Sequence, residues 1–237
     1  MNNLKNKVVY ITGGSKGIGF GVASKLLEAG MKVAISSRLL ENAQKAAKSL
    51  GSEDNVLAIA SDVSKIGDEK SAVKKILDKW GKLDVVVANA GVGHFAPVDQ
   101  ISDTLWHEMV NTNLNGVYHS LKASVEALKQ SKGYYITLAS LAGTNFFANG
   151  AGYNATKFGV VGFTQAAMLD LRPYDIKVST IMPGSVATNF NGHEPSKEDA
   201  WKIQPEDIGE LVLDLLKMNP RTLPSKIEVR PSRPDKK

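Results

Sequence analysis

The sequence predicts an α/β fold, a doubly wound and mostly parallel sheet of seven strands with helices on both faces. Short, almost continuously apolar runs alternate with longer amphipathic stretches, and such runs are typical of strands that are buried on both faces. Glycines stand where helices should end and strands should begin. The length of 237 residues suits one domain, because α/β folds often reach this size as a single unit.

The alternation can be followed element by element. The predicted strands are Val8–Ile11, Val33–Ile35, Val56–Ile59, Leu83–Ala88, Tyr134–Leu138, Ile176–Ile181 and Ile227–Val229. The predicted helices are Ile18–Ala29, Leu40–Leu50, Glu69–Trp80, Asp103–Gln130, Tyr153–Leu171 and Glu206–Met218. This order predicts one domain over residues 1–237. Residues 183–205 are rich in proline and glycine and interrupt the pattern, so we expect a mobile substrate flap there.

Composition excludes several classes of function. The chain has no cysteine, which removes disulfides, thiolate metal sites and cysteine nucleophiles, and we expect no metal site. No apolar run reaches the ~18 residues of a membrane span, and residues 1–7 do not form a signal peptide, so we expect a cytoplasmic protein. Much of the net charge of +5 lies in and beside a basic tail at about 231–237. The rest is near neutral, which argues against a nucleic-acid partner.

A glycine-rich turn follows the first strand and leads into a predicted helix. It reads Thr12-Gly13-Gly14-Ser15-Lys16-Gly17-Ile18-Gly19. Glycines at this place let the backbone turn sharply and approach a pyrophosphate, which the helix N-terminus attracts. The spacing is GxxxGxG rather than GxGxxG, but strand, turn and helix at the start of a βαβ unit are the context that such a site requires. We therefore expect a dinucleotide to bind here.

The same turn also fits a hydrolase pattern, in which Ser15 is the nucleophile of a G-x-S-x-G elbow. Such an enzyme needs a histidine, and the chain has four: His94, His107, His119 and His193. His107 and His119 fall inside predicted helices, whereas His193 lies in the flap and could be recruited. A nucleophile elbow normally follows several earlier strands, so a serine hydrolase is the remote alternative.

The end of the second strand indicates which dinucleotide binds. Dinucleotide sites that prefer NAD place an Asp or Glu there for the ribose 2′-hydroxyl, and an Arg accommodates the 2′-phosphate of NADP. The sequence at this place is Ser36-Ser37-Arg38, with no acid before Glu41. Arg38 can pair with a phosphate through its planar fork, Ser37 can donate a hydrogen bond, and Lys16 adds a second charge. These residues favour NADP(H).

Tyr153 and Lys157 give the strongest chemical signal. On a helix, residues four apart share one face, so the phenol and the ammonium should face the same space. A positive charge nearby stabilises phenolate and should lower the pKa of Tyr153 toward working pH. Ser140 ends the preceding strand, at the sheet edge where doubly wound folds bind ligands. The three side chains should therefore meet in one site.

In these motifs the chain resembles the short-chain dehydrogenase/reductase family, in its compact, single-domain Rossmann-fold branch. The matching residues occur in family order over nearly the whole chain: Thr12–Gly19, Asp62-Val63, Asn89-Ala90-Gly91, Asn113, Ser140, Tyr153-x-x-x-Lys157, and Pro183-Gly184 followed by Val186 and Thr188. Three departures are present. The second strand ends in Ser-Arg rather than Asp, Ala88 precedes Asn89 where many relatives have two asparagines, and Ile227–Pro231 lacks a Gly-Gly ending.

The resemblance implies a role for each catalytic residue. Tyr153 would be the general acid in carbonyl reduction, or the base in alcohol oxidation, and Ser140 would hydrogen-bond the substrate oxygen. Lys157 would bind the nicotinamide ribose, and Asn113 would hold a water that relays protons. Cofactor contacts are implied for Gly13, Ser15, Lys16, Gly17, Ile18, Gly19, Ser37, Arg38, Asp62, Val63, Asn89, Ala90, Gly91, Tyr153, Lys157, Pro183, Gly184, Val186 and Thr188.

We therefore expect an NADPH-dependent oxidoreductase that reduces a ketone or aldehyde, with 3-oxoacyl groups as one candidate, and the rival hypothesis is a catalytically silent dinucleotide sensor. The substrate walls should be His94, Phe95, Leu141 to Phe147, Asn149 and Ser185 to Trp201. Within them, Phe146, Phe147, Phe190 and Trp201 should form an apolar pocket. The resemblance also implies a homodimer or homotetramer that packs through the long helices at Thr112–Gln130 and Tyr153–Leu171.

Overall fold

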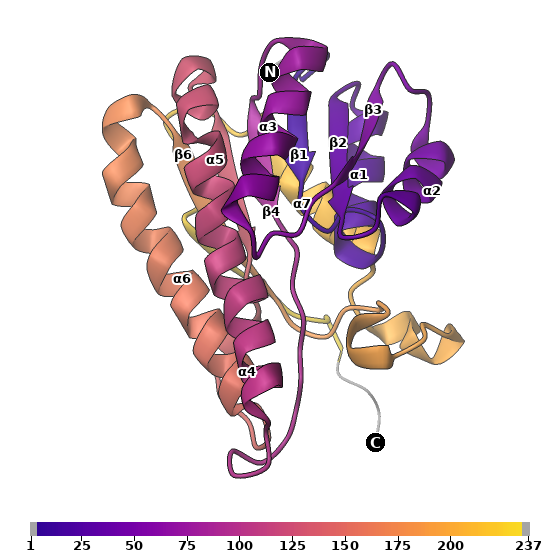
Figure 1. Cartoon of the computed structure of the whole chain (residues 1–237), viewed down its shortest axis with the longest axis vertical. Coiled ribbons are helices and arrows are strands. Elements are labelled where there is room, and N and C mark those ends of the chain that lie inside the picture. Colours follow the sequence, from indigo (N-terminus) through magenta and orange to yellow (C-terminus); the bar gives the residue numbers. More distant parts are fainter. Residues whose placement is uncertain (1–3, 234–237) are drawn as a thin grey trace.

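The computed structural model describes residues 4–233, so part of the predicted basic tail, 234–237, lies outside the described residues. Its centre is one seven-stranded sheet in the order β3-β2-β1-β4-β5-β6-β7 (Figure 1), and every pairing between neighbours is parallel. The strands are β1 (Val8–Ile11), β2 (Lys32–Ser37), β3 (Val56–Ala60), β4 (Val85–Ala88), β5 (Tyr134–Leu138), β6 (Lys177–Pro183) and β7 (Lys226–Val229). The predicted α/β fold is confirmed, and its sheet is parallel throughout.

Helices cover both faces of this sheet. They are α1 (Gly17–Glu28), α2 (Leu40–Leu50), α3 (Ile66–Trp80), α4 (Asp103–Met109), α5 (Gly116–Ser131), α6 (Ala151–Leu171) and α7 (Pro205–Lys217). Buried side chains of α3, α5 and α6 form one hydrophobic core with the sheet, and those of α1, α2 and α7 form a second core on the opposite face (Figure 1). None of the helices in residues 4–233 is both long and apolar enough to cross a membrane.

One predicted helix differs from the structure. The stretch expected as Asp103–Gln130 is divided into α4, a π-helical segment at Val110–Asn115, and α5. In the π segment, the amide of Gly116 bonds to the carbonyl of Asn111, five residues back. A widened turn of this kind does not interrupt the apolar pattern of a helix. The sequence pattern therefore predicted one continuous helix and not the π segment. π segments of this kind often occur at functional sites, and this one contains Asn113.

The strand order also locates a crevice. It reverses at β1, since β2 and β3 lie on one side of this strand and β4 to β7 lie on the other. Because all strands are parallel, their carboxyl ends meet at one edge. In a doubly wound sheet, ligands bind in the crevice outside those ends, at the point of reversal. The turn after β1 and the loop after β4 border this point.

Candidate active site

A cleft of about 1600 Å³ opens at the carboxyl edge of the sheet. Pockets for drug-sized ligands hold about 300–1,000 Å³, so this cleft has room for a dinucleotide together with a second molecule. Most residues predicted for the site line it: Gly13, Ser15, Lys16, Gly17, Ile18, Ser37, Arg38, Asp62, Val63, Asn89, Ala90, Gly91, Ser140, Tyr153, Lys157, Pro183, Gly184, Val186 and Thr188. The two others, Gly19 and Asn113, are buried beside it.

The turn after β1 requires glycine at two positions. Gly13 has a φ of +64°, and a Cβ there would lie 2.9 Å from the Ala90 Cα. At Gly19, in α1, a Cβ would lie 2.5 Å from the Asn89 side-chain nitrogen. The first turn of α1 holds no acidic residue, and its N-cap Lys16 makes no side-chain cap. The N-terminal amides of α1 therefore keep their capacity to hold an anion.

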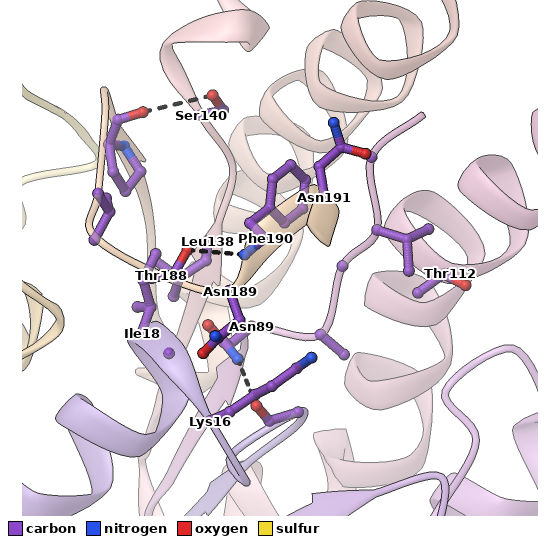
Figure 2. A pocket seen from close by; sticks show the side chains of 18 of the residues that line it. Lys16, Ile18, Asn89, Thr112, Leu138, Ser140, Thr188, Asn189, Phe190 and Asn191 are labelled. Carbon is purple, nitrogen blue, oxygen red and sulfur yellow. Dashed lines mark hydrogen bonds between the residues drawn. The ribbon is translucent and has the colours of Figure 1, made fainter. Parts of the chain in front are cut away.

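Thr12 and Asn89 fasten this turn to the end of β4. The Thr12 hydroxyl accepts hydrogen bonds of 3.0 Å from the backbone N–H groups of Asn89 and Ala90. The Asn89 side chain donates to the carbonyls of Thr12 and Gly13 at 2.9 and 3.1 Å, on the side of the pocket where Lys16 lies (Figure 2). Asn89 thus fixes the shape of the glycine turn, a structural role that its predicted place beside the cofactor did not include.

Arg38 extends from the end of β2 into the cleft and meets an unexpected partner. Its side chain is 68% exposed, and its Nη1 lies 3.5 Å from Glu108 Oε1 of α4. The second oxygen of Glu108 is 2.8 Å from His94 Nε2, and all three residues line the cleft. Sequence reasoning missed Glu108, because nothing in a local pattern links α4 to the end of β2.

Asp62 presents an ionised carboxylate to the cleft. Burial opposes its ionisation, but hydrogen bonds from the Ser64 hydroxyl and amide, with Lys65 and Arg38 nearby, outweigh burial and lower the pKa of Asp62. The two bonds from Ser64 to Asp62 Oδ1 measure 2.7 and 3.0 Å. A carboxylate in this state accepts hydrogen bonds only, so it suits an amino group such as that of adenine.

Ser140, Tyr153 and Lys157 meet at the opposite end of the cleft. Ser140 follows β5, where its Oγ accepts a hydrogen bond of 3.1 Å from the amide of Ala142. Tyr153 and Lys157 stand near the start of α6, and Lys157 Nζ lies 5.6 Å from the centre of the Tyr153 ring. Lys157 Nζ also donates to the Leu138 carbonyl at 2.9 Å. A hydroxyl, a phenol and an ammonium therefore share one space.

Burial, rather than Lys157, dominates the pKa of Tyr153. Burial raises the pKa of Tyr153 to about 12, although a hydrogen bond with Ser140 opposes the rise. The same burial lowers the pKa of Lys157 to about 8. The prediction that Lys157 lowers the pKa of Tyr153 is wrong for this structure, because burial raises that pKa and the ammonium, which lies 5.6 Å from the centre of the ring, bonds to the Leu138 carbonyl instead of the phenol. Tyr153 is therefore a protonated donor throughout the neutral range.

Asn113 joins the loop after β4 to α6. Its Oδ1 accepts a hydrogen bond of 2.8 Å from the amide of Val92. Its Nδ2 donates to the Val92 carbonyl at 2.9 Å and to Thr156 Oγ1 at 3.0 Å. Both ends of the side-chain amide are thus engaged with protein. Thr156 is a supporting residue that sequence reasoning missed, although it lies inside the Tyr153-to-Lys157 motif itself.

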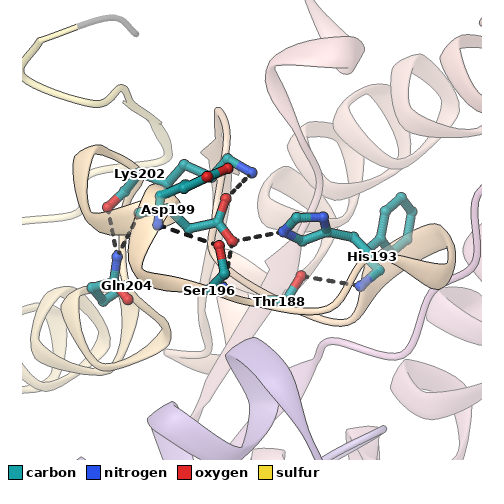
Figure 3. A network of polar contacts seen from close by, with 8 residues as sticks. Thr188, His193, Ser196, Asp199, Lys202 and Gln204 are labelled. Carbon is teal, nitrogen blue, oxygen red and sulfur yellow. Dashed lines mark hydrogen bonds and ion pairs between the residues drawn. The ribbon is translucent and has the colours of Figure 1, made fainter.

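The flap is organised around one carboxylate, Asp199 (Figure 3). Its Oδ2 accepts a hydrogen bond of 3.0 Å from the amide of Ser196 and lies 2.7 Å from His193 Nε2, while Oδ1 lies 2.5 Å from Lys202 Nζ. These contacts, that of Lys202 first, hold the pKa of Asp199 well below its usual value. A bridge between Val186 and Ile203 ties the two ends of the loop. The expected mobile flap thus has a defined fold with a buried polar centre.

Three expectations about the substrate walls are corrected. Trp201, Asn149 and Phe95 are not among the residues that line the cleft. Trp201 is the last residue of the short 3-10 helix Lys197–Trp201. The residue after this helix, Lys202, lines the cleft instead. Asn149 lies in the turn before α6, in a left-handed conformation with a φ of +65°. The other predicted walls include His94, Leu141 and Phe190, which do line the cleft.

The residues needed for a serine hydrolase are not assembled. Within residues 4–233, no hydrogen bond joins Ser15 to a histidine. The Nε2 atom of His193, the candidate from the flap, is taken by Asp199. Ser15 lies instead in the glycine turn, among the residues that line the cleft next to the N-terminus of α1.

Solved structures with the same fold align with this chain over nearly its whole length. An alcohol dehydrogenase from the archaeon Thermococcus sibiricus, complexed with 5-hydroxy-NADP, is 32% identical with a TM-score of 0.90, covering 98% of this chain and 100% of that one. A 3-ketoacyl-(acyl-carrier-protein) reductase from Brucella melitensis, complexed with NADH, is 29% identical with a TM-score of 0.89, covering 97% and 99%.

Sequence comparison gives the same result. Trans-4-hydroxycyclohexanecarboxylate dehydrogenase from Sinomonas cyclohexanicum is 31% identical over 228 residues, which cover 90% of this chain and 87% of that protein. The family model described as short chain dehydrogenase matches residues 7–199, a span that includes the glycine turn, Ser140, Tyr153 and Lys157. The chain therefore belongs to the short-chain dehydrogenase family of oxidoreductases.

Proposed function

We propose that this protein is an NADPH-dependent oxidoreductase that reduces a ketone or an aldehyde to an alcohol. The observation that carries the proposal is the protonated phenol of Tyr153, which lies in the cleft with Ser140 and Lys157 around it. Relatives described as an alcohol dehydrogenase and a 3-ketoacyl reductase support this class of reaction. A 3-oxoacyl group is one candidate for the carbonyl.

Each catalytic residue has a task in this reaction. Tyr153 donates its phenolic proton to the carbonyl oxygen as that oxygen gains negative charge. Ser140 donates a second hydrogen bond to the same oxygen and so stabilises the charge. Lys157 binds the nicotinamide ribose, and Asn113 positions the loop after β4 against α6. When bound, the nicotinamide cofactor supplies the hydride.

The cations at the β2 end of the cleft support NADP(H) as the cofactor. Lys16 and Lys45 line this end, and neither makes an ion pair within residues 4–233. In the part of the chain that the structure describes, the one ion pair of Arg38 is the long and exposed contact with Glu108, and exposed ion pairs of this kind contribute little. A 2′-phosphate would supply an anion for Lys16 and Lys45 and a stronger partner than Glu108 for Arg38, with Ser37 beside it. The turn amides at Gly13 to Gly19 fit the pyrophosphate, and Asp62 with Val63 fits the adenine.

Exposed apolar side chains on α5 and α6 support a homo-oligomer. Tyr118, Phe158 and Leu169 are 48%, 44% and 58% exposed, and large apolar groups gathered on neighbouring helices often mark a subunit contact. We therefore propose that two copies pack through these helices. Light scattering should give a mass of two or four chains, whereas the mass of one chain would contradict the proposal.

The decisive experiment is NADPH consumption with a panel of ketones and aldehydes. We expect turnover with at least one carbonyl compound and alcohol as the product. Tight NADPH binding without turnover of any compound would instead identify a dinucleotide sensor. Serine-hydrolase activity that depends on Ser15 would contradict both.

A further inference from the structure

Phenylalanines gather at the substrate end of the cleft, where Phe147 and Phe190 line it and Phe95, which does not line it, packs against both. The Phe95 ring centre lies 5.5 Å from that of Tyr153 and 5.7 Å from that of Phe147. The Phe190 ring centre lies 5.7 Å from Tyr153 and 6.5 Å from Phe95. We call Phe95, Phe147 and Phe190 the aromatic wall. With Phe146 at its outer rim, it takes up more than half of the 7 phenylalanines in the chain.

These rings are far more exposed than phenylalanine usually is. Phe95, Phe147 and Phe190 are 39%, 48% and 37% exposed, and Phe146 is 86% exposed. A contiguous apolar surface of this kind marks a binding site more often than a chance exposure. Because Phe95 and Phe190 contact the ring of Tyr153 and Phe147 lines the same cleft, the wall lies beside the position of a substrate whose carbonyl group reaches Tyr153.

Phe190, the residue of the aromatic wall that comes from the flap, is held in position by contacts within the chain itself. A Cβ added to Gly93 would lie 2.5 Å from the tip of the Phe190 ring, so this ring rests on the bare backbone of Gly93. The amide of Phe190 donates to Thr188 Oγ1 at 3.4 Å, and Figure 2 shows the ring inside the pocket that Ser140 also lines. A substrate would therefore meet a preformed wall, which reduces the entropy that binding costs.

Apart from Lys157, which the proposed function assigns to the nicotinamide ribose, the basic side chains considered at this end of the cleft have acidic partners. His193 and Lys202 both contact Asp199, at 2.7 and 2.5 Å. Arg230, on the chain that follows β7, lies 3.0 Å from Glu228. Lys16 and Lys45, which lack such partners within residues 4–233, lie at the cofactor end. With Lys157 engaged by the cofactor, an anionic substrate would thus find aromatic rings and cations that are already paired.

We propose that the aromatic wall selects an uncharged ketone with a six-membered ring, aryl or alicyclic, next to its carbonyl. The inference rests on the proposed function, in which Tyr153 gives the proton. The ketone carbon receives the hydride of NADPH and its oxygen receives the Tyr153 proton, so that the ketone becomes a secondary alcohol and NADPH becomes NADP⁺. Aromatic rings gain from edge-to-face and offset contacts at the spacings found here.

A matched set of ketones tests this directly. The compounds are acetophenone and cyclohexyl methyl ketone, butanone as the small control, and 4-acetylbenzoate as the anionic control. With saturating NADPH, kcat/KM should be about tenfold or more higher for the two neutral ring ketones than for butanone. Acetophenone should also exceed 4-acetylbenzoate. Equal values for butanone, or a preference for 4-acetylbenzoate, would overturn the inference.

Variants of the wall localise the effect. Phe147→Ala and Phe190→Ala should each lower kcat/KM for acetophenone about five- to twentyfold and that for butanone by less than about twofold. Tyr174→Ala is the matched control, since Tyr174 is also 48% exposed and does not line the cleft. If the Phe variants instead change the oligomeric mass and affect both ketones equally, the wall is a subunit contact and the inference is wrong.

A binding measurement separates this inference from the proposed function. Tyr153→Phe loaded with NADP⁺ should bind acetophenone more tightly than butanone, as measured by saturation-transfer NMR. If the wild type turns over no ketone but the variant binds acetophenone more tightly than butanone, the proposed reductase function is wrong and the proposed role of the aromatic wall is supported. If the wild type reduces ketones but the variant binds both compounds equally, the wall fails and the reductase proposal stands.

Discussion

The cofactor end and the substrate end of one cleft are built from different parts of the chain. The cofactor end consists of backbone amides in the glycine turn, Asp62 as an ionised acceptor, and the basic residues Lys16, Arg38 and Lys45. The substrate end consists of side chains, with exposed aromatic rings and charges that are paired within the flap. The proposed cofactor end thus combines the backbone amides of one turn with charged side chains, whereas the proposed substrate end depends mainly on aromatic side chains from distant segments.

Tyr153→Phe should give the largest effect, because it removes the proton donor where the two ends meet. We expect kcat to fall about a thousandfold, as for loss of a general acid. The NADPH dissociation constant should change by less than about twofold, because the ring and its packing remain. Steady-state rates and a fluorescence titration measure the two quantities. Retained activity would remove Tyr153 from the mechanism, and Tyr174→Phe is the matched control.

Arg38→Asp should change the cofactor end alone. Charge-assisted hydrogen bonds to phosphate are strong, so the NADPH dissociation constant should rise about 10- to 100-fold. NADH should bind better than to the wild type, since the new carboxylate can accept the ribose hydroxyls. Lys48→Asp makes the same charge change on α2 at a residue that does not line the cleft. An unchanged ratio of NADPH to NADH affinity would contradict the NADP(H) assignment.

The pH dependence of cofactor binding should come from Lys157. Its pKa is lowered to about 8 by burial, so the ligand-free enzyme loses this positive charge as the pH rises above that value. The NADPH dissociation constant should then rise by up to about tenfold per pH unit. Tyr153, with its pKa raised to about 12, stays protonated over the same range. A profile that is flat to pH 9.5, or one that Lys157→Met does not flatten, would refute this.

Glu108→Gln should give the smallest effect, which is an increase in the affinity for NADPH. Glu108 competes with a 2′-phosphate for Arg38 across the cleft. Removing its charge should tighten NADPH binding about two- to fivefold, the worth of an exposed ion pair, and leave NADH binding unchanged. Glu126→Gln removes a similar exposed carboxylate, paired with Lys129 at 2.9 Å on α5, and serves as the control. Weaker NADPH binding would mean that Glu108 supports the cofactor rather than competing with it.

The sequence predicted what depends on neighbouring residues. The bounds of β1 and β5 agree with the apolar runs Val8–Ile11 and Tyr134–Leu138, because strands buried on both faces need continuous apolar residues. The glycine turn was predicted for the same reason, since its function lies in backbone conformation. Ser140, Tyr153 and Lys157 were placed together by a spacing of four on a helix and by the common edge of parallel strands.

Contacts between distant segments could not be predicted in this way. The meeting of Arg38 with Glu108 depends on how α4 lies against the end of β2, and the aromatic wall depends on Phe190 resting on Gly93. The contacts of Asp199 with Ser196, His193 and Lys202 could not be predicted either, because in the sequence Asp199 is one of several acidic residues in a polar loop. The lowered pKa expected for Tyr153 was wrong because burial, which depends on the packing around the ring, outweighs the charge of Lys157.

In the proposed reaction, Tyr153 donates the proton that completes the reduction of a ketone held between the two ends of the cleft. The most direct measurement is the amount of alcohol formed per NADPH consumed, with acetophenone, by the wild type and by Tyr153→Phe. We expect one molecule of alcohol per NADPH in the wild type. We expect almost no product in the variant, although the variant still binds NADPH. NADPH loss without alcohol in the wild type, or equal alcohol from both proteins, would contradict the proposed reaction.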